Sequence, residues 1–152
     1  FVTDLGSDKI YAHRVLTNGL LEESRSEIAI TPGNGPRHIR FNAKGDRAYV
    51  LNELSSDVDV FKVAGSALEK IQSIPADTSA AKVKGSADIH ISPNGKWLLA
   101  SNRISSNQVV VFKVNADGKL TRVFHQNVAK IPRNFTFDPS GKFVLVASQK
   151  TQ

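Results

Sequence analysis

Residues 87–103 read ADIHISPNGKWLLASNR, and two other stretches of the chain carry the same phrase. They are PRHIRFNAKGDRAYVLNE at residues 36–53 and PRNFTFDPSGKFVLVASQ at residues 132–149. A second phrase repeats in step as KIYAHRV, DVDVFKV and QVVVFKV, at residues 9–15, 57–63 and 108–114. The chain is therefore built from a unit of about 50 residues, a spacing typical of repeat architectures.

Each unit is predicted to hold four short strands. In the first complete unit these lie at residues 38–42, 48–52, 58–63 and 68–74, where β-branched and aromatic residues dominate. The turn after the first strand ends in glycine in all three copies, and two copies have proline second, as a type I turn prefers. No segment has a convincing helical period. Four antiparallel strands per repeat predict an all-β fold of β-propeller blades, whereas a β-sandwich, the alternative, does not require the phrase three times.

The phase of the repeat divides the chain into whole and partial blades. We predict a half-blade at residues 1–34, blades at 35–75 and 86–129, and a half-blade at 131–152, each half-blade lacking two strands. A propeller has typically 4–8 blades, so this arc of about three cannot close. We expect it to associate with missing blades or with itself, and to be inactive alone.

The composition excludes several kinds of site. The absence of cysteine rules out disulfides, thiolate metal ligands and a cysteine nucleophile. The four histidines lack ligand-like spacing, so we expect no metal and no cofactor. The net charge is +6, but the basic residues are spread along the chain, which argues against nucleic-acid binding. No apolar run approaches the roughly 20 residues of a membrane span, and no signal peptide is visible, so we expect no membrane partner and a cytoplasmic location.

Five phrases, in this order, resemble the lactonase family of propellers: GPRHI at 35–39, NEL at 52–54, ADIHISPNG at 87–95, SNR at 101–103 and PRNF at 132–135. The resemblance covers essentially the whole chain and implies a seven-bladed whole. It also implies a lactone hydrolase, converting 6-phosphogluconolactone to 6-phosphogluconate in the pentose phosphate pathway. A muconate-type cycloisomerase on the same scaffold is one alternative, and a non-catalytic binding propeller is another.

The resemblance further implies where the active site lies. It carries catalytic roles to Arg37 of GPRHI, Glu53 of NEL and Arg103 of SNR, all at the central mouth of the propeller. The family also uses a histidine from a preceding blade, whose segment would lie before Phe1.

The repeat itself directs more residues to that mouth. Arg133 occupies the same repeat position as Arg37, and Asp88 the same position as His38. We therefore expect Arg133, His38 and Asp88 to be substrate-binding, with a small anionic substrate as the partner. In the alternative interpretation Glu53 and Arg103 only pair with neighbouring charges, His38 hydrogen-bonds an adjacent blade, and Asp88 orients a neighbour.

Lactone hydrolysis needs an activated water and a group that stabilises the oxyanion. Glu53 is the candidate general base, a role typically worth about 10²–10⁴-fold in rate. Arg37 and Arg103 are candidates to stabilise negative charge on the carbonyl oxygen, or to bind a phosphate or carboxylate.

Overall fold

The computed structural model describes residues 1–150, and its regular structure there consists of thirteen strands and no helix. None of the described residues forms a helix that could cross a membrane. The strands are β1 Val2–Asp4, β2 Lys9–Val15, β3 Leu21–Ala29, β4 Pro36–Phe41, β5 Arg47–Asn52, β6 Asp57–Ala64, β7 Ala67–Pro75, β8 Ser86–Ile91, β9 Trp97–Asn102, β10 Gln108–Val114, β11 Leu120–Asn127, β12 Pro132–Phe137 and β13 Val144–Ser148.

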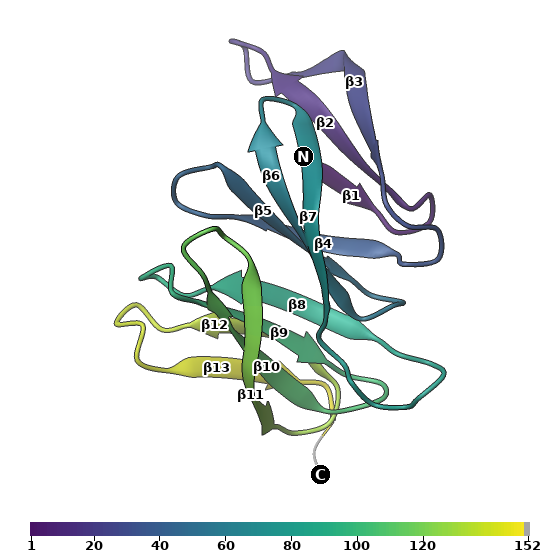
Figure 1. Cartoon of the computed structure of the whole chain (residues 1–152). Coiled ribbons are helices and arrows are strands. Elements are labelled where there is room, and N and C mark those ends of the chain that lie inside the picture. The colour runs from purple at the N-terminus through teal and green to yellow at the C-terminus, as the bar shows by residue number, and fades with distance from the viewer. Residues whose placement is uncertain (151–152) are drawn as a thin grey trace.

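The strands form four antiparallel sheets that follow one another along the chain (Figure 1). Their orders are β1-β2-β3, β4-β5-β6-β7, β8-β9-β10-β11 and β12-β13. The predicted all-β propeller arc is confirmed, and the four strands predicted for the first complete unit agree with β4 to β7 within two residues at each end. The expectation that each partial blade lacks two strands is wrong for the amino-terminal one. Its sheet has three strands, because the polar stretch Leu21–Ala29 pairs with β2.

Glycine ends each of the repeated turns for a conformational reason. Gly45, Gly95 and Gly141 all have φ close to +70°, in the left-handed region. The amide of each donates to the carbonyl three residues earlier, at 3.0, 2.8 and 2.9 Å respectively. The turn thus closes the hairpin between the first and second strands of each blade, as the sequence predicted.

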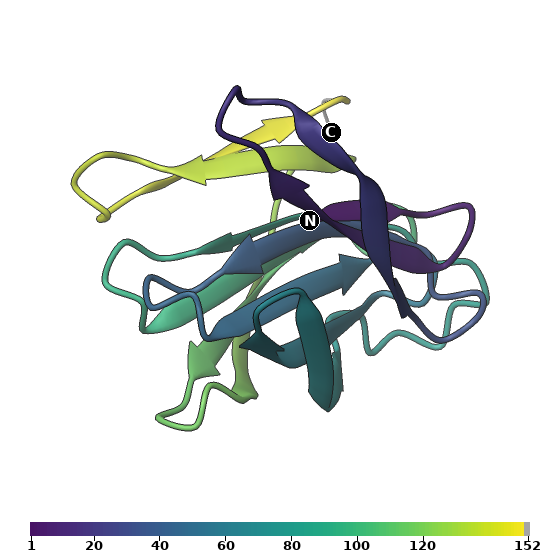
Figure 2. The same cartoon turned by 90° about the horizontal axis from the view of Figure 1, so that it is seen from above.

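The core lies between successive sheets. Leu51, Val58 and Val60 of one blade share an apolar cluster with Ile89 and Leu98 of the next. The first strands β4, β8 and β12 also lie side by side, and Figure 2 shows the sheets from above as separate twisted layers. Because sheets pack face to face, the first strands of neighbouring blades come within side-chain reach of one another.

Each of these first strands is bulged near its start. The pairing register shifts between Pro36 and His38, between Ser86 and Ile89, and between Pro132 and Asn134. A bulge redirects a side chain and frees backbone groups from the ladder. Arg37, Ala87 and Arg133 therefore sit at irregular positions on the mouth side of three successive blades.

Candidate functional site

Glu53 lies between two arginines from different blades. Its Oε1 accepts from Nη2 of Arg103 at 2.5 Å, and its Oε2 forms an ion pair with Nε of Arg37 at 2.9 Å. The three side chains are 18, 19 and 11 % exposed for Arg37, Glu53 and Arg103, so the ion pairs are largely shielded from water. Charge-assisted bonds of this kind are stronger than neutral ones, and here they join two blades.

Equivalent backbone hydrogen bonds position Glu53 and Arg103. The amide of Glu53 donates to the carbonyl of Gly35 at 2.7 Å, and that of Arg103 donates to Gly85 at 2.9 Å. Gln149, the third member of this repeat position, donates to Ile131 at 3.0 Å. The residue after each second strand is thus fixed against the residue before each first strand, at the mouth end of the blade.

Arg133 joins this group across an open hollow of about 430 Å³. The hollow is lined by Arg37, His38, Arg133, Asn134, Ala147, Ser148 and Gln149. Burial lowers the pKa of Arg103, and the positive charges of Arg37 and Arg133 lower it further, against the opposing effect of Glu53. Arg37, Glu53, Arg103 and Arg133, hereafter the mouth cluster, therefore share one region, as their repeat positions predicted.

The mouth cluster has spare capacity for an anion. It holds three guanidinium groups and one carboxylate, so two positive charges remain uncompensated within it. Nε of Arg103 is buried without a hydrogen-bond partner among the described residues. A buried donor left unpaired costs free energy, and an anionic ligand is one group that could satisfy it.

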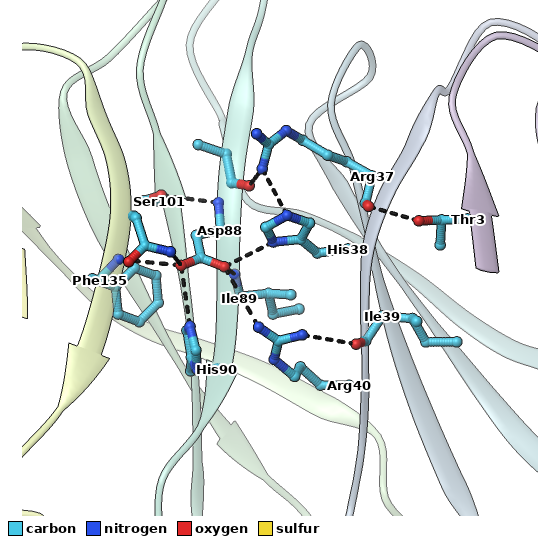
Figure 3. A network of polar contacts seen from close by, with 12 residues as sticks. Thr3, Arg37, His38, Ile39, Arg40, Asp88, Ile89, His90, Ser101 and Phe135 are labelled. Atoms are coloured by element: carbon cyan, nitrogen blue, oxygen red, sulfur yellow. Dashed lines mark hydrogen bonds and ion pairs between the residues drawn. The ribbon is translucent and has the colours of Figure 1, made fainter. Parts of the chain in front are cut away.

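Beneath the mouth, Asp88 is the centre of a second polar network (Figure 3). The residue is fully buried, yet each of its carboxylate oxygens accepts several bonds. Oδ1 accepts from Nδ1 of His38 at 2.8 Å and from its neighbour's amide, Ile89 N, at 2.9 Å. Oδ2 accepts from Nδ2 of Asn134 at 2.6 Å, from the Phe135 amide at 3.1 Å and from Nε2 of His90 at 3.1 Å. We call Asp88, His38, His90 and Asn134 the Asp88 hub.

The hub explains the charge state of Asp88. Burial by itself raises the pKa of this carboxyl, but the bonds from His38, His90 and the Phe135 amide outweigh burial and hold the pKa well below its usual range. The buried carboxylate is therefore ionised and joins β4, β8 and β12. Because Asp88 has no exposed surface, we expect it to orient its neighbours rather than to contact a substrate, whereas His38 lines the hollow.

Sequence reasoning missed several contributors to these networks. One is Arg40, whose Nη2 lies 3.8 Å from Oδ1 of Asp88. Asn134 occupies the repeat position of His38 and Asp88, and that equivalence was the available signal for its contact with Asp88. Thr3, on β1, donates from Oγ1 to the carbonyl of Arg37 at 2.7 Å. That carbonyl is left out of the β4–β5 register by the bulge, which no feature of the sequence marked.

No group of three or more His, Asp or Glu side chains within residues 1–150 is arranged to hold a metal ion. The side chains described at the mouth supply guanidinium, carboxylate and imidazole groups. These can bind an anion, stabilise an oxyanion and transfer a proton.

Comparison with known proteins agrees with this geometry. The family model described as "Lactonase, 7-bladed beta-propeller" matches residues 1–152. A 6-phosphogluconolactonase of Formosa agariphila is 38% identical over 155 residues, which cover 98% of this chain and 44% of the relative. The chain therefore spans less than half the length of that relative.

Two solved structures share the arrangement of strands. One, from Bacteroides uniformis, has a TM-score of 0.90 and 41% identity, covering 97% of this chain and 43% of its own. The other is the periplasmic gluconolactonase of Pseudomonas aeruginosa, with a TM-score of 0.90, 35% identity and the same two coverages. With a matching fold, a matching family model and relatives above 30% identity, the chain belongs to the lactonase family of seven-bladed β-propellers.

Proposed function

We propose that this chain forms part of an enzyme that hydrolyses 6-phosphogluconolactone to 6-phosphogluconate. The observation that carries the proposal is the mouth cluster, in which arginines from three blades gather beside one hollow and two of them pair with one glutamate. A lactone bearing a phosphate presents a dianion and develops a second negative centre on its carbonyl oxygen during attack. The surplus positive charge of the cluster matches both.

The roles follow from position. Arg133 is exposed and lines the hollow, so we assign it to the substrate phosphate. Arg37 and Arg103 are more buried, and we assign them to the oxyanion, because donors in a shielded site stabilise developing charge best.

We assign the general base to Glu53. A carboxylate has about four lone-pair sites, so Glu53 can accept a proton from water while Arg37 and Arg103 hold it in place. The leaving ring oxygen then takes the proton back as the ring opens.

We also propose a setting for the reaction. The family resemblance supports a reaction in the pentose phosphate pathway and in the cytoplasm, whereas the Pseudomonas aeruginosa relative is named periplasmic. Cell fractionation with an antibody against the protein decides between the two compartments.

Residues 1–152 alone are proposed to be inactive and to associate with further blades or with another copy. Phe143, Leu145 and Phe124 are 67, 58 and 56 % exposed, and exposed apolar surface of this kind promotes association. Light scattering on residues 1–152 tests this, and a monodisperse 16.5 kDa monomer that hydrolyses lactone contradicts it.

The direct test of function uses the full-length gene product and two substrates. Hydrolysis of 6-phosphogluconolactone and of the unphosphorylated gluconolactone is followed by the proton released. We expect the phosphorylated lactone to be preferred by about tenfold or more in kcat/KM, the worth of one charge-assisted contact. Failure to hydrolyse either lactone overturns the proposal.

A further inference from the structure

We propose that Asp88 and His38 are positioning residues that hold the Arg37 guanidinium in place at the mouth. The inference deepens the proposed lactone hydrolysis and rests on it for its effect on rate. Its structural content is a continuous path of polar contacts from the buried hub to the mouth cluster. The path runs through Asp88, His38, Arg37, Glu53 and Arg103.

The first step is the tautomer of His38. Its Nδ1 lies 2.8 Å from Oδ1 of Asp88, an ionised carboxylate that can only accept. Its Nε2 lies 3.0 Å from Nη1 of Arg37, a guanidinium nitrogen that can only donate. The two contacts are satisfied together only when the imidazole is neutral, with its proton on Nδ1 and a lone pair on Nε2. Figure 3 shows the ring of His38 between these two partners.

The second step is the orientation of Arg37. Its Nη1 donates to two acceptors, Nε2 of His38 and the carbonyl of Ala87, and its Nε forms an ion pair with Oε2 of Glu53 at 2.9 Å. The Ala87 carbonyl is available because the bulge at the start of β8 removes it from the ladder. Loss of the His38 contact leaves Nη1 held by the Ala87 carbonyl alone, so the guanidinium is less firmly fixed beside Glu53.

The third step is the rigidity of the hub. Asp88 cannot turn to follow a moving partner, because bonds from β8 and β12 fix both of its oxygens. The rigid carboxylate thereby fixes the tautomer and ring angle of His38. Tautomer control by a buried aspartate has a large effect in serine proteases, where removing the charge leaves geometry intact but presents the wrong ring nitrogen.

His90 provides a matched comparison within the same hub. It also donates to Asp88, at 3.1 Å, but its ring packs edge-on against Phe135 at 5.0 Å and it does not line the hollow. A merely structural hub predicts similar consequences for loss of either histidine. The positioning role predicts consequences at Arg37 for loss of His38 alone.

The test uses the 15N-labelled full-length gene product and two readouts. Imidazole 15N–1H correlations report which ring nitrogen of His38 carries the proton, and exchange of the Arg37 Nε–H with water reports how firmly it is held to Glu53. The variants are Asp88→Asn, His38→Leu, His38→Gln, which keeps an acceptor near the Nε2 position, and His90→Gln as the control. Lactone kinetics are measured on the same samples.

We expect the proton on Nδ1 in the parent and its redistribution toward Nε2 in Asp88→Asn. In Asp88→Asn and His38→Leu the Arg37 Nε–H should exchange faster, and kcat should fall about tenfold or more with a smaller change in KM. His38→Gln should keep most of the parent's protection of the Arg37 Nε–H and most of its kcat. His90→Gln should resemble the parent in both measurements.

The outcomes distinguish the proposed lactone hydrolysis from the positioning role of Asp88 and His38. A parent that hydrolyses no lactone but shows the expected tautomer and exchange supports the positioning role and overturns the proposed function. An active parent whose Arg37 exchange is unchanged by His38→Leu and Asp88→Asn overturns the positioning role. Should His38→Leu fail to fold, the tautomer of the parent and the exchange in His38→Gln and Asp88→Asn still decide.

Discussion

The mouth cluster and the Asp88 hub are neighbouring polar networks that differ in how far their charges are compensated. In the hub, one buried carboxylate accepts bonds on both oxygens, and Nη2 of Arg40 lies 3.8 Å from its Oδ1 and supplies a counter-charge. In the mouth cluster, one carboxylate pairs with two guanidiniums, a third guanidinium lines the hollow beside them, and positive charge is left over. A network that balances its charge holds blades together, whereas one that leaves charge unbalanced next to solvent can bind a ligand.

The change that separates the two regions most strongly is Glu53→Gln. We expect kcat for 6-phosphogluconolactone to fall about 100-fold, because the amide cannot take a proton from water. The melting temperature should fall as well, because Arg37 and Arg103, which are largely shielded from water, lose their counter-charge. Steady-state kinetics and thermal unfolding of the full-length gene product check this, with Glu69→Gln, at an exposed position on β7, as the control. Activity within a few-fold of the parent removes Glu53 as the base.

Asp88→Asn tests the Asp88 hub, where we expect the main effect to be on stability. Loss of a buried charge that several donors share should lower the free energy of unfolding by about 2–4 kcal/mol at neutral pH. Urea unfolding measures this, again against Glu69→Gln. A change below about 0.5 kcal/mol, the range of an ordinary surface substitution, contradicts the account of the hub.

The same residue predicts a pH dependence. The pKa of Asp88 is lower folded than its ordinary value of 3.8, so the folded protein binds this proton less readily than the unfolded chain. Its contribution to stability is therefore complete above that ordinary value and is lost as pH falls below it. Urea unfolding between neutral and acidic pH should show a steeper loss of stability in the parent than in Asp88→Asn. An equal loss of stability with falling pH in the parent and in Asp88→Asn contradicts a lowered pKa of Asp88.

Arg133→Gln sharpens the assignment of the substrate phosphate. We expect kcat/KM to fall about tenfold for the phosphorylated lactone, mostly through KM, and to stay nearly constant for gluconolactone. The control is Lys113→Gln, which removes a positive charge from an exposed position on β10. Equal losses on both lactones place Arg133 elsewhere than at the phosphate.

The smallest effect is expected at the backbone support of Arg103. A β-carbon at Gly85 meets the side chain of Ile104, whose exposed end can partly move away. Gly85→Ala should therefore cost only about 1 kcal/mol of stability. Gly6→Ala is the control, because its nearest neighbour would be 3.7 Å from the new carbon. A larger loss at Gly6 than at Gly85 contradicts the packing described here.

The repeat made most of the fold predictable, because turn glycines and alternating apolar residues mark strands locally. It also brought Arg37, Glu53, Arg103 and Arg133 to one region, since equivalent positions in successive blades face the same way. The third strand of the amino-terminal sheet was missed because Leu21–Ala29 is mostly polar and its pairing with β2 is not a local property.

The hub was only partly foreseen. The sequence aligned His38 with Asp88, but alignment places residues at equivalent positions and does not state which of them touch. Contact requires the distance between β4, β8 and β12, and the bulges that free the Arg37 and Ala87 carbonyls. Tautomers and bulges depend on partners far apart in the chain, so local sequence patterns do not reveal them.

The central claim is that the mouth cluster binds a phosphorylated lactone, and a crystal structure of the full-length gene product with 6-phosphogluconate tests it most directly. We predict the phosphate within hydrogen-bonding distance of Arg133 and the product carboxylate against Arg37 and Arg103. Product bound away from all three arginines contradicts the claim.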